Sequence, residues 1–274
     1  MRGFDFYCRG PYIKRVIMIT IKSKDEIEIL REGGKRLAFI LQKVAKAVKP
    51  GVSTADLNDL ASNLASERGD IPSSLNYKPK GAKRAYPAAI CVSINDEIVH
   101  GIPNENPKIL KEGDIVSLDM CLTHSGLVTD AAITVPVGKI DPVAKKLIEV
   151  TKEALYAGIK AARGNKHTGD IGYAVERVAK ANGFSIVEDL CGHGVGYSVH
   201  EDPYVPNYGE RGRGDKLKSG MIIAIEPMLN EGGKDTIIDK DGYTFKTKDG
   251  LRSAHFEHSV LITNGEAEIL TKMM

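Results

Sequence analysis

Two neighbouring apolar stretches of this chain each carry an acidic residue, and this feature limits the possible folds most strongly. The first stretch, IVSLDMCL, contains Asp119, and the second, LVTDAAITV, contains Asp130. Such apolar runs are typical of buried strands, and burial of an isolated carboxylate carries a large free-energy cost. The fold must therefore supply a partner for both carboxylates inside a sheet.

The connection between the two stretches predicts how they pair. Thr123–Gly126 has a suitable length for a hairpin turn. Opposed residues of a symmetric hairpin have numbers with a constant sum, so a Thr123–Gly126 pair predicts that Asp119 faces Asp130. Their Cβ atoms would then lie about 5 Å apart. Like charges at this spacing are destabilising unless a cation lies between them or one of them is protonated.

Three further residues extend this acidic group. Glu226 ends the strand-like segment MIIAIEPM, Glu257 lies in HFEHSVLIT, and His193 is flanked by glycines in CGHGVG. A single acid in a strand is usually an edge residue or a hydrogen-bonded structural group. Four acids, in strands without Lys or Arg to neutralise them, favour a site for divalent metal ions. So many carboxylates can hold two ions through bridging oxygens, an arrangement that activates water.

A helix, a turn and a second capped helix occur twice along the chain. Apolar spacing predicts helices over about 26–49 and 54–67, and a shift of 114 residues aligns Thr54 with Thr168 and Asp56 with Asp170. Thr at the cap, with Asp two residues later, suits a helix N-terminus in both copies. The repeat predicts one domain over 18–274, made of two related halves at about 18–140 and 141–274.

The remaining segments predict an α+β fold with an antiparallel sheet. Gly and Asn turns follow many of the strand candidates, which are 90–94, 115–122, 127–137, 221–225 and 256–263. The Pro-, Gly- and charge-rich stretch 201–218 predicts a long surface loop. Met18 opens a short predicted strand that leads to a Ser23 helix cap. Residues 1–17 have no clear period, and we expect either a disordered extension that arises from a gene start assigned too far upstream or an arm packed on the body.

Composition and charge narrow the partners. The 38 Lys and Arg residues against 36 Asp and Glu leave a formal charge of +2, which gives no reason to expect nucleic acid as a partner. The apolar run near the start, Val16–Ile19, is far shorter than the roughly 20 residues that cross a bilayer. It also lacks the features of a secretory signal. We therefore expect a cytoplasmic protein that does not contact a membrane.

With these features the chain closely resembles the type I methionine aminopeptidases over about residues 18–274. The resemblance rests on MITIKSKDEIEILREGGK, CVSINDEIVHGIPN, GDIVSLDMCLTHSGLVTDAA, CGHGVGYSVHEDPYVPNYG, LKSGMIIAIEPM and SAHFEHSVLIT. It implies the pita-bread fold, in which two pseudo-symmetric halves with an antiparallel sheet covered by helices surround a dinuclear metal centre. The implied ions are two divalent metals, Co, Mn, Fe or Zn.

The resemblance also implies roles for individual residues. Asp119 chelates one metal, His193 and Glu226 bind the other, and Asp130 and Glu257 bridge the two. His100 and His200 contact the substrate, near the scissile amide nitrogen and the carbonyl oxygen respectively, and Glu226 passes a proton to the leaving amine. Tyr86 and Cys91 line the methionine pocket. The other four histidines match no catalytic position and are expected to be structural: His124, His167, His255 and His258.

Two segments depart from the family pattern. Residues 77–84, YKPKGAKR, lack the usual aromatic and Gly-containing pattern, and Tyr243 stands where many relatives carry Trp. Both departures concern the pocket rather than the metal ligands. They leave details of the pocket lining open.

The activity implied by the resemblance is removal of the N-terminal methionine from nascent proteins when the second residue is small. The implied partners are the N-termini of nascent polypeptides and, transiently, the ribosome, with the enzyme acting as a monomer. Two alternatives remain from the sequence. One is another pita-bread peptidase of the Xaa-Pro type, and the other is a non-catalytic pita-bread protein that binds peptides or ribosomes.

Overall fold

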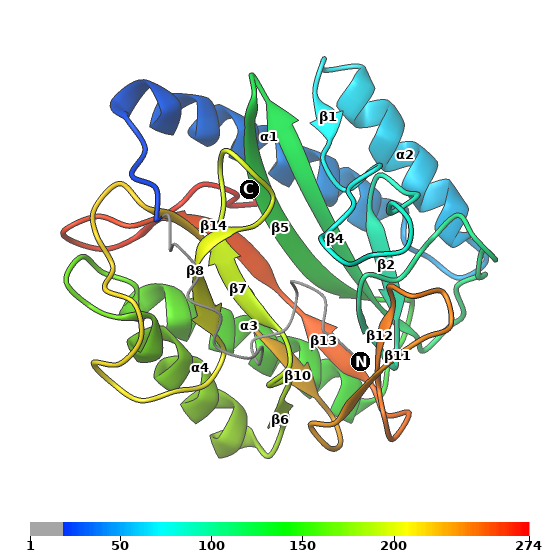
Figure 1. The fold of residues 1–274 in the computed structure, drawn as a ribbon. Coiled ribbons are helices and arrows are strands. Elements are labelled where there is room, and N and C mark those ends of the chain that lie inside the picture. Colours follow the sequence, from blue (N-terminus) through cyan, green and yellow to red (C-terminus); the bar gives the residue numbers. More distant parts are fainter. Residues whose placement is uncertain (1–18, 274) are drawn as a thin grey trace.

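The computed structural model describes residues 19–273, so the predicted extension at 1–17 and the first residue of the predicted strand at Met18 lie outside the described residues. Within this range the chain forms four helices (Figure 1), and they are α1 (Lys24–Ala47), α2 (Thr54–Ser66), α3 (Pro142–Ala161) and α4 (Thr168–Asn182). The Ser23 cap is confirmed, because its side chain accepts a hydrogen bond from the Glu26 amide.

The helix starts repeat at the predicted offset, since α2 begins at Thr54 and α4 at Thr168. The cap prediction was wrong by one residue, because Ser53 and His167 are the N-caps and the threonines occupy the first helical turn. Each cap amide donates to the Asp three residues later, Ser53 to Asp56 at 3.1 Å and His167 to Asp170 at 2.8 Å. Each carboxylate thus accepts a hydrogen bond from a backbone amide, and its negative charge interacts favourably with the positive end of the helix dipole.

A large antiparallel sheet runs through the molecule in the order β1-β4-β5-β14-β9-β7-β8, with β2 on β4 and β15 on β14. Two smaller sheets have the orders β13-β10-β6 and β11-β12-β3. The strand bounds are β1 (Ile71–Pro72), β2 (Cys91–Ile94), β3 (Glu97–Val99), β4 (Ile115–His124), β5 (Leu127–Pro136), β6 (Ser185–Ile186), β7 (Cys191–Gly194), β8 (Glu201–Pro206), β9 (Ile222–Ile225), β10 (Met228–Asn230), β11 (Thr236–Ile238), β12 (Phe245–Thr247), β13 (Ser253–His255), β14 (Glu257–Leu261) and β15 (Glu268–Ile269). The predicted α+β class with an antiparallel sheet is confirmed.

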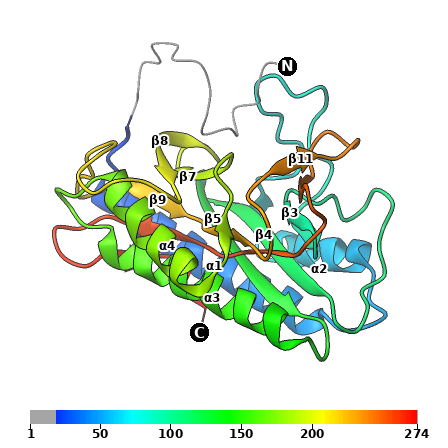
Figure 2. The same cartoon turned by 90° about the horizontal axis from the view of Figure 1, so that it is seen from below.

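The four helices lie together on one side of the large sheet, and β3 and β11 lie on its other side (Figure 2). Buried Leu41 of α1 and Leu57 of α2 pack in one apolar cluster with Leu118 of β4. Buried Ile159 of α3 packs in a second cluster with Ile225 of β9. Because the helices seal one face of the sheet with apolar side chains, polar groups that point from the other face are left to form a site.

The predicted register of the β4–β5 hairpin was wrong, because the numbers of opposed residues add up to a sum that is two higher than predicted. His124 pairs with Leu127, so Asp119 lies opposite Ala132 and Asp130 lies opposite Cys121. The cause is a two-residue turn in which Ser125 and Gly126 both have positive φ, 47° and 85°, a geometry that matches the twist of the flanking strands. A shift of two in the sum keeps both carboxylates on the same face of the sheet, so they remain diagonal neighbours.

Two further predictions were wrong. Residues 19–22 form no strand in the described part of the chain, although the Lys22 amide donates to the Gly220 carbonyl at 2.9 Å. The first third of the predicted loop at 201–218 is strand β8, which pairs with β7. Its Pro203 and Pro206 favour a loop in the sequence, but β8 is the last strand of the sheet order, and prolines are tolerated on an edge strand.

Helix α4 packs so closely on the segment after β8 that a side chain does not fit at Gly172. A Cβ atom there would lie 2.3 Å from the Tyr208 carbonyl oxygen. We expect Gly172→Ala to lower the free energy of unfolding by about 1–3 kcal/mol, because backbone must move. Gly265→Ala is the control, since its Cβ would meet no atom closer than 3.8 Å. Urea unfolding of both variants tests this, and equal losses would contradict the close packing at Gly172.

Candidate metal centre

The five predicted metal ligands come from five strands that are consecutive in the large sheet. Strands β4, β5, β14, β9 and β7 neighbour one another in this order, and they carry or directly precede Asp119, Asp130, Glu257, Glu226 and His193. Glu257 pairs with Ala132, which also pairs with Asp119. The sheet therefore gathers residues that are up to 138 positions apart, since 257 − 119 = 138.

The side chains of these residues lie close to one another. His193 Nε2 lies 3.9 Å from Asp130 Oδ2 and 3.3 Å from Glu226 Oε1. Ligand atoms of Asp130, His193 and Glu257 all lie within 4.8 Å of one another. Asp119 and Glu226 line the same pocket as these three residues. The structure thus assembles the predicted set.

The backbone sets the tautomer of His193. Its Nδ1 lies 2.9 Å from the Gly194 carbonyl oxygen, and a carbonyl only accepts, so Nδ1 carries the proton. In the neutral imidazole the lone pair is then on Nε2, the atom that faces the carboxylates. This arrangement is the usual way in which a second contact orients a metal-binding histidine.

The four carboxylates are buried, and burial makes their charged forms unfavourable. Burial raises the pKa of Glu226 to about 7, and that of Asp130 to about 6 in spite of a hydrogen bond from Cys121. Removal from water and the Asp130 charge raise the pKa of Asp119 to about 8, and burial raises that of Glu257 well above its usual range. Within residues 19–273, buried Asp130 Oδ1 and Glu257 Oε1 have no hydrogen-bond partner. Orphaned carboxylate oxygens beside an imidazole lone pair fit a divalent metal.

Two residues of this centre were missed by sequence reasoning. His255, expected to be structural, is buried with Nε2 3.6 Å from Glu226 Oε2, so it lies next to a predicted ligand. Its place near the ligands could have been inferred from its spacing to Glu257, because residues two apart in a strand point to the same face of the sheet. Cys121 donates its thiol hydrogen to Asp130 Oδ2 at 2.8 Å, a contact hidden by the wrong hairpin register. His124, His167 and His258 lie elsewhere, on Asp70, at the α4 cap and on Thr271.

His100 and His200 both line the pocket beside these ligands. The rings of His193 and His200 have centroids 4.4 Å apart. Burial, followed by the nearby histidines, lowers the pKa of His100 to about 3 and that of His200 well below its usual range. Both imidazoles are therefore neutral at physiological pH, and each has one nitrogen that donates and one that accepts.

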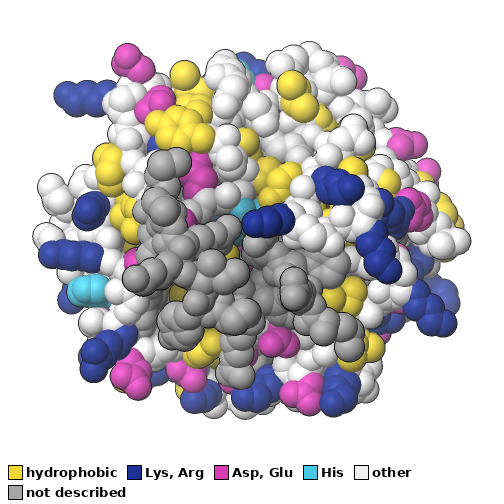
Figure 3. All heavy atoms as spheres, viewed as in Figure 1, with side chains coloured by type: hydrophobic (Ala, Val, Ile, Leu, Met, Phe, Trp, Pro, Cys, Tyr) yellow, Lys and Arg dark blue, Asp and Glu magenta, His cyan; other side chains and the backbone are white. Residues whose placement is uncertain are grey.

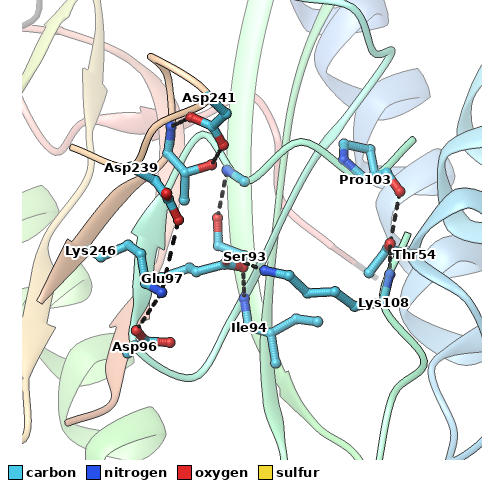
Figure 4. A network of polar contacts seen from close by, with 12 residues as sticks. Thr54, Ser93, Ile94, Asp96, Glu97, Pro103, Lys108, Asp239, Asp241 and Lys246 are labelled. Carbon is cyan, nitrogen blue, oxygen red and sulfur yellow. Dashed lines mark hydrogen bonds and ion pairs between the residues drawn. The ribbon is translucent and has the colours of Figure 1, made fainter. Parts of the chain in front are cut away.

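A hydrogen-bond network holds the backbone that leads to His100, which has a positive φ of 61°. Such a value is strained for a residue with a side chain and persists only when its surroundings enforce it. The buried Glu97 carboxylate accepts from the Ile94 amide at 2.9 Å and from Lys108, as Figure 4 shows. The Ser93 hydroxyl accepts from the Gly101 amide at 3.1 Å. This network fixes the turn after β3 and aims His100 at the pocket.

The predicted pocket residues Tyr86 and Cys91 do line the pocket, together with Tyr243. Tyr86 and Tyr243 meet edge to face with ring centroids 5.2 Å apart. The Tyr86 hydroxyl donates to the Gly101 carbonyl at 2.8 Å, so its ring rather than its polar tip remains for a ligand. This part of the pocket lining is aromatic and suits an apolar side chain.

Tyr77 also lines the pocket and contacts His200, with its hydroxyl 2.9 Å from His200 Nδ1. We expect Tyr77→Phe to lower kcat by about three- to tenfold at unchanged KM, because one hydrogen bond that orients the imidazole is lost. Tyr156→Phe on α3 is the control, since it keeps the same chemical change far from the pocket. Steady-state kinetics of both variants tests this, and a wild-type kcat for Tyr77→Phe would contradict the orienting role.

A buried ion pair supports the segment that carries His200. Lys22 Nζ lies 2.8 Å from Glu201 Oε2, and the Lys22 side chain is fully buried. The other Glu201 oxygen accepts from the Ser198 amide at 3.0 Å. The chain before α1 thus ties down the loop that ends at His200.

Comparisons with known proteins agree with this geometry. The model of Metallopeptidase family M24 matches residues 28–264. A methionine aminopeptidase of Aquifex aeolicus is 47% identical over 259 residues, which cover 93% of this chain and 99% of that protein. The crystal structure of methionine aminopeptidase from Thermotoga maritima superposes with a TM-score of 0.89 at 42% identity, over 93% of this chain and 100% of that chain.

A more distant structure shares the fold alone. Prolidase from Pyrococcus furiosus superposes with a TM-score of 0.72 at 22% identity, over 93% of this chain and 66% of that chain. The fold is therefore the pita-bread fold common to both kinds of peptidase. The family match over most of the chain, and the high identity over nearly the full length of the first relative, decide the assignment: the chain belongs to metallopeptidase family M24 and, within it, to the methionine aminopeptidases.

Proposed function

We propose that this protein removes the N-terminal methionine from polypeptides whose second residue is small, by metal-dependent hydrolysis. The observation that carries the proposal is one pocket with two kinds of lining. Acidic residues and His193 from five adjoining strands line it together with the aromatic rings of Tyr86 and Tyr243. A methionine side chain bound against these rings would place its own peptide bond at the acidic residues.

We propose two divalent ions at the acidic part of the lining. Asp119 would hold one ion, His193 and Glu226 the other, and Asp130 and Glu257 both. When bound, the ions supply an activated water and polarise the scissile carbonyl. Co, Mn, Fe and Zn all accept such a mixed carboxylate and imidazole site.

The chain's own groups would handle the proton and the developing charge. Glu226, whose Oε1 lies 3.3 Å from His193 Nε2, would take a proton from water and give it to the leaving amine. Neutral His200 would donate from Nε2 to the carbonyl oxygen if Nδ1 accepts the Tyr77 hydroxyl hydrogen. His100 would contact the scissile amide nitrogen. Cys91 and Tyr86 would bound the methionine side chain.

The partners follow from the substrate. We propose that the enzyme acts on N-termini of nascent polypeptides in the cytoplasm, as a monomer that associates transiently with the ribosome. Among the described helices none is both long and apolar enough to span a membrane. Residues 18–274 would form one catalytic unit of two halves, because 18–140 contributes Asp119 and Asp130 and 141–274 contributes the other three ligands.

Peptide specificity tests the function. Protein loaded with Mn or Co is expected to release methionine from Met-Gly-Met and to leave Ala-Pro-Met intact, and chelation is expected to abolish the release. Cleavage of Ala-Pro-Met instead would favour a prolidase-like enzyme. Metal binding without cleavage of either peptide would favour a non-catalytic peptide-binding protein.

A further inference from the structure

The segment Lys78–Arg84 leaves the rim of the pocket and returns to it. Tyr77 and Tyr86, which flank the segment, both line the pocket. Its base is closed by two backbone hydrogen bonds, from the Asn76 amide to the Tyr86 carbonyl at 2.9 Å and from the Tyr86 amide to the Tyr77 carbonyl at 2.8 Å. Figure 2 shows the chain between β1 and β2 projecting from the body on the side away from the helices. We call Lys78–Arg84 the rim loop.

The rim loop carries four cations in seven residues, in the sequence KPKGAKR. Arg84 is engaged, because its guanidinium donates two hydrogen bonds to Glu105 and its carbonyl accepts from the Tyr243 hydroxyl at 2.5 Å. Lys78, Lys80 and Lys83 are exposed, and no carboxylate of residues 19–273 lies within ion-pair distance of them. Three of the four charges are therefore available to a ligand.

Neighbouring acids offset only part of these charges. Glu105 is paired with Arg84. The Asp241 carboxylate accepts from the Thr244 hydroxyl and from the amides of residues 243 and 244 and keeps its charge, so two acids stand against the four cations of the rim loop. Next to the pocket residue His200, Glu201 is paired with buried Lys22. Figure 3 shows Lys and Arg side chains beside a histidine that is visible near the centre of this face. The rim loop side of the mouth therefore carries an excess of positive charge.

A polypeptide bound by its first residue must pass this rim. The methionine side chain packs against the aromatic rings, so the third and later residues leave the pocket through its mouth. An extended chain advances about 3.3 Å per residue, and Lys78 directly follows a pocket residue. We propose that the rim loop is a specificity element that favours substrates with acidic residues at the third to fifth positions. The inference rests on the proposed function and deepens it.

The expected effect on kcat/KM is modest, because the lysine side chains of the rim loop are exposed to solvent. Ion pairs between exposed side chains are weak and screened by salt. Several pairs acting together are expected to raise kcat/KM about three- to tenfold for an acidic peptide over a neutral one at low ionic strength. Most of the gain is expected in KM, because the charges act on peptide capture rather than at the scissile bond.

The test compares three amidated peptides, Met-Gly followed by three Glu, three Gln or three Lys. The wild-type protein is expected to cleave the Glu peptide with the highest and the Lys peptide with the lowest kcat/KM, and 0.5 M NaCl is expected to remove most of the difference. In the triple variant Lys78→Gln, Lys80→Gln, Lys83→Gln the ratio of Glu to Gln peptide is expected to fall toward 1.

The matched control changes three exposed lysines at the helix side of the sheet, Lys46→Gln, Lys49→Gln and Lys152→Gln. It has the same net charge as the rim loop variant and is expected to keep the wild-type ratio. Equal cleavage of the three peptides by wild-type protein, or equal ratios in the two triple variants, would overturn the specificity role. Failure to cleave any of the peptides would instead overturn the proposed function.

Discussion

His193→Ala is expected to lose activity together with metal. His193 offers an Nε2 lone pair 3.3 Å from Glu226 and 3.9 Å from Asp130, and its removal would leave the ion proposed at Glu226 with one ligand fewer. Loss of a coordinating imidazole weakens metal binding directly. The purified variant is therefore expected to bind less than the wild-type amount of metal and to show no measurable release of methionine from Met-Gly-Met.

His200→Ala provides the contrast, because the two rings are only 4.4 Å apart between centroids. This change removes a hydrogen-bond donor but no proposed ligand. Metal content and KM are expected to stay near wild type, and kcat is expected to fall by about 10²–10³-fold, the usual effect of losing one such donor. Metal analysis and steady-state kinetics on both variants check the assignment. Metal loss in His200→Ala, or an unchanged kcat, would show that the roles are wrong.

Asp130→Asn is expected to abolish activity yet stabilise the metal-free protein at alkaline pH. The pKa of Asp130 is raised to about 6 in the folded chain, mainly by burial. A carboxyl whose folded pKa is raised contributes stability below its unfolded pKa of about 4 and loses it as pH rises through about 6. At pH 8 the wild-type apo protein therefore holds an unfavourable charge that the variant lacks, a difference of about 3 kcal/mol.

Urea unfolding of both proteins with a chelator, at pH 5 and pH 8, measures this difference. The stability gain of Asp130→Asn is expected to be larger at pH 8 than at pH 5. Added metal is expected to stabilise the wild-type protein more than the variant, because a proposed bridging ligand is gone. A variant less stable than wild type at pH 8 without metal would contradict the free-energy cost assigned to the buried Asp130 charge.

The candidate ligands could be identified from the sequence because each breaks a local rule. Asp119 and Asp130 lie in runs that are otherwise apolar, and Glu226 and Glu257 do the same in two other strands. Burial of unpaired charge is too costly to be accidental at four places. The helix repeat was likewise visible, because capping and apolar spacing are local properties of the chain.

Register and long-range contacts were not visible in this way. The β4–β5 pairing depended on positive φ at Ser125 and Gly126. The turn is shorter than predicted, so Asp130 lies opposite Cys121 instead of Asp119, although the apolar pattern of both strands is unchanged. Strand β8 was hidden because its prolines resemble those of a loop, and only its place at the sheet edge allows them.

The sequence by itself determined which side chains must be neutralised, since apolar neighbours and acidic groups are written along the chain. Only the tertiary structure decided which of these groups meet. The order β4-β5-β14-β9-β7 places the five candidate ligands side by side and brings His255 next to Glu226. It also places the Tyr77 hydroxyl on His200 and the lysines of the rim loop at the pocket mouth. Such contacts arise from strand order and loop closure, which join residues far apart in sequence and leave no local pattern.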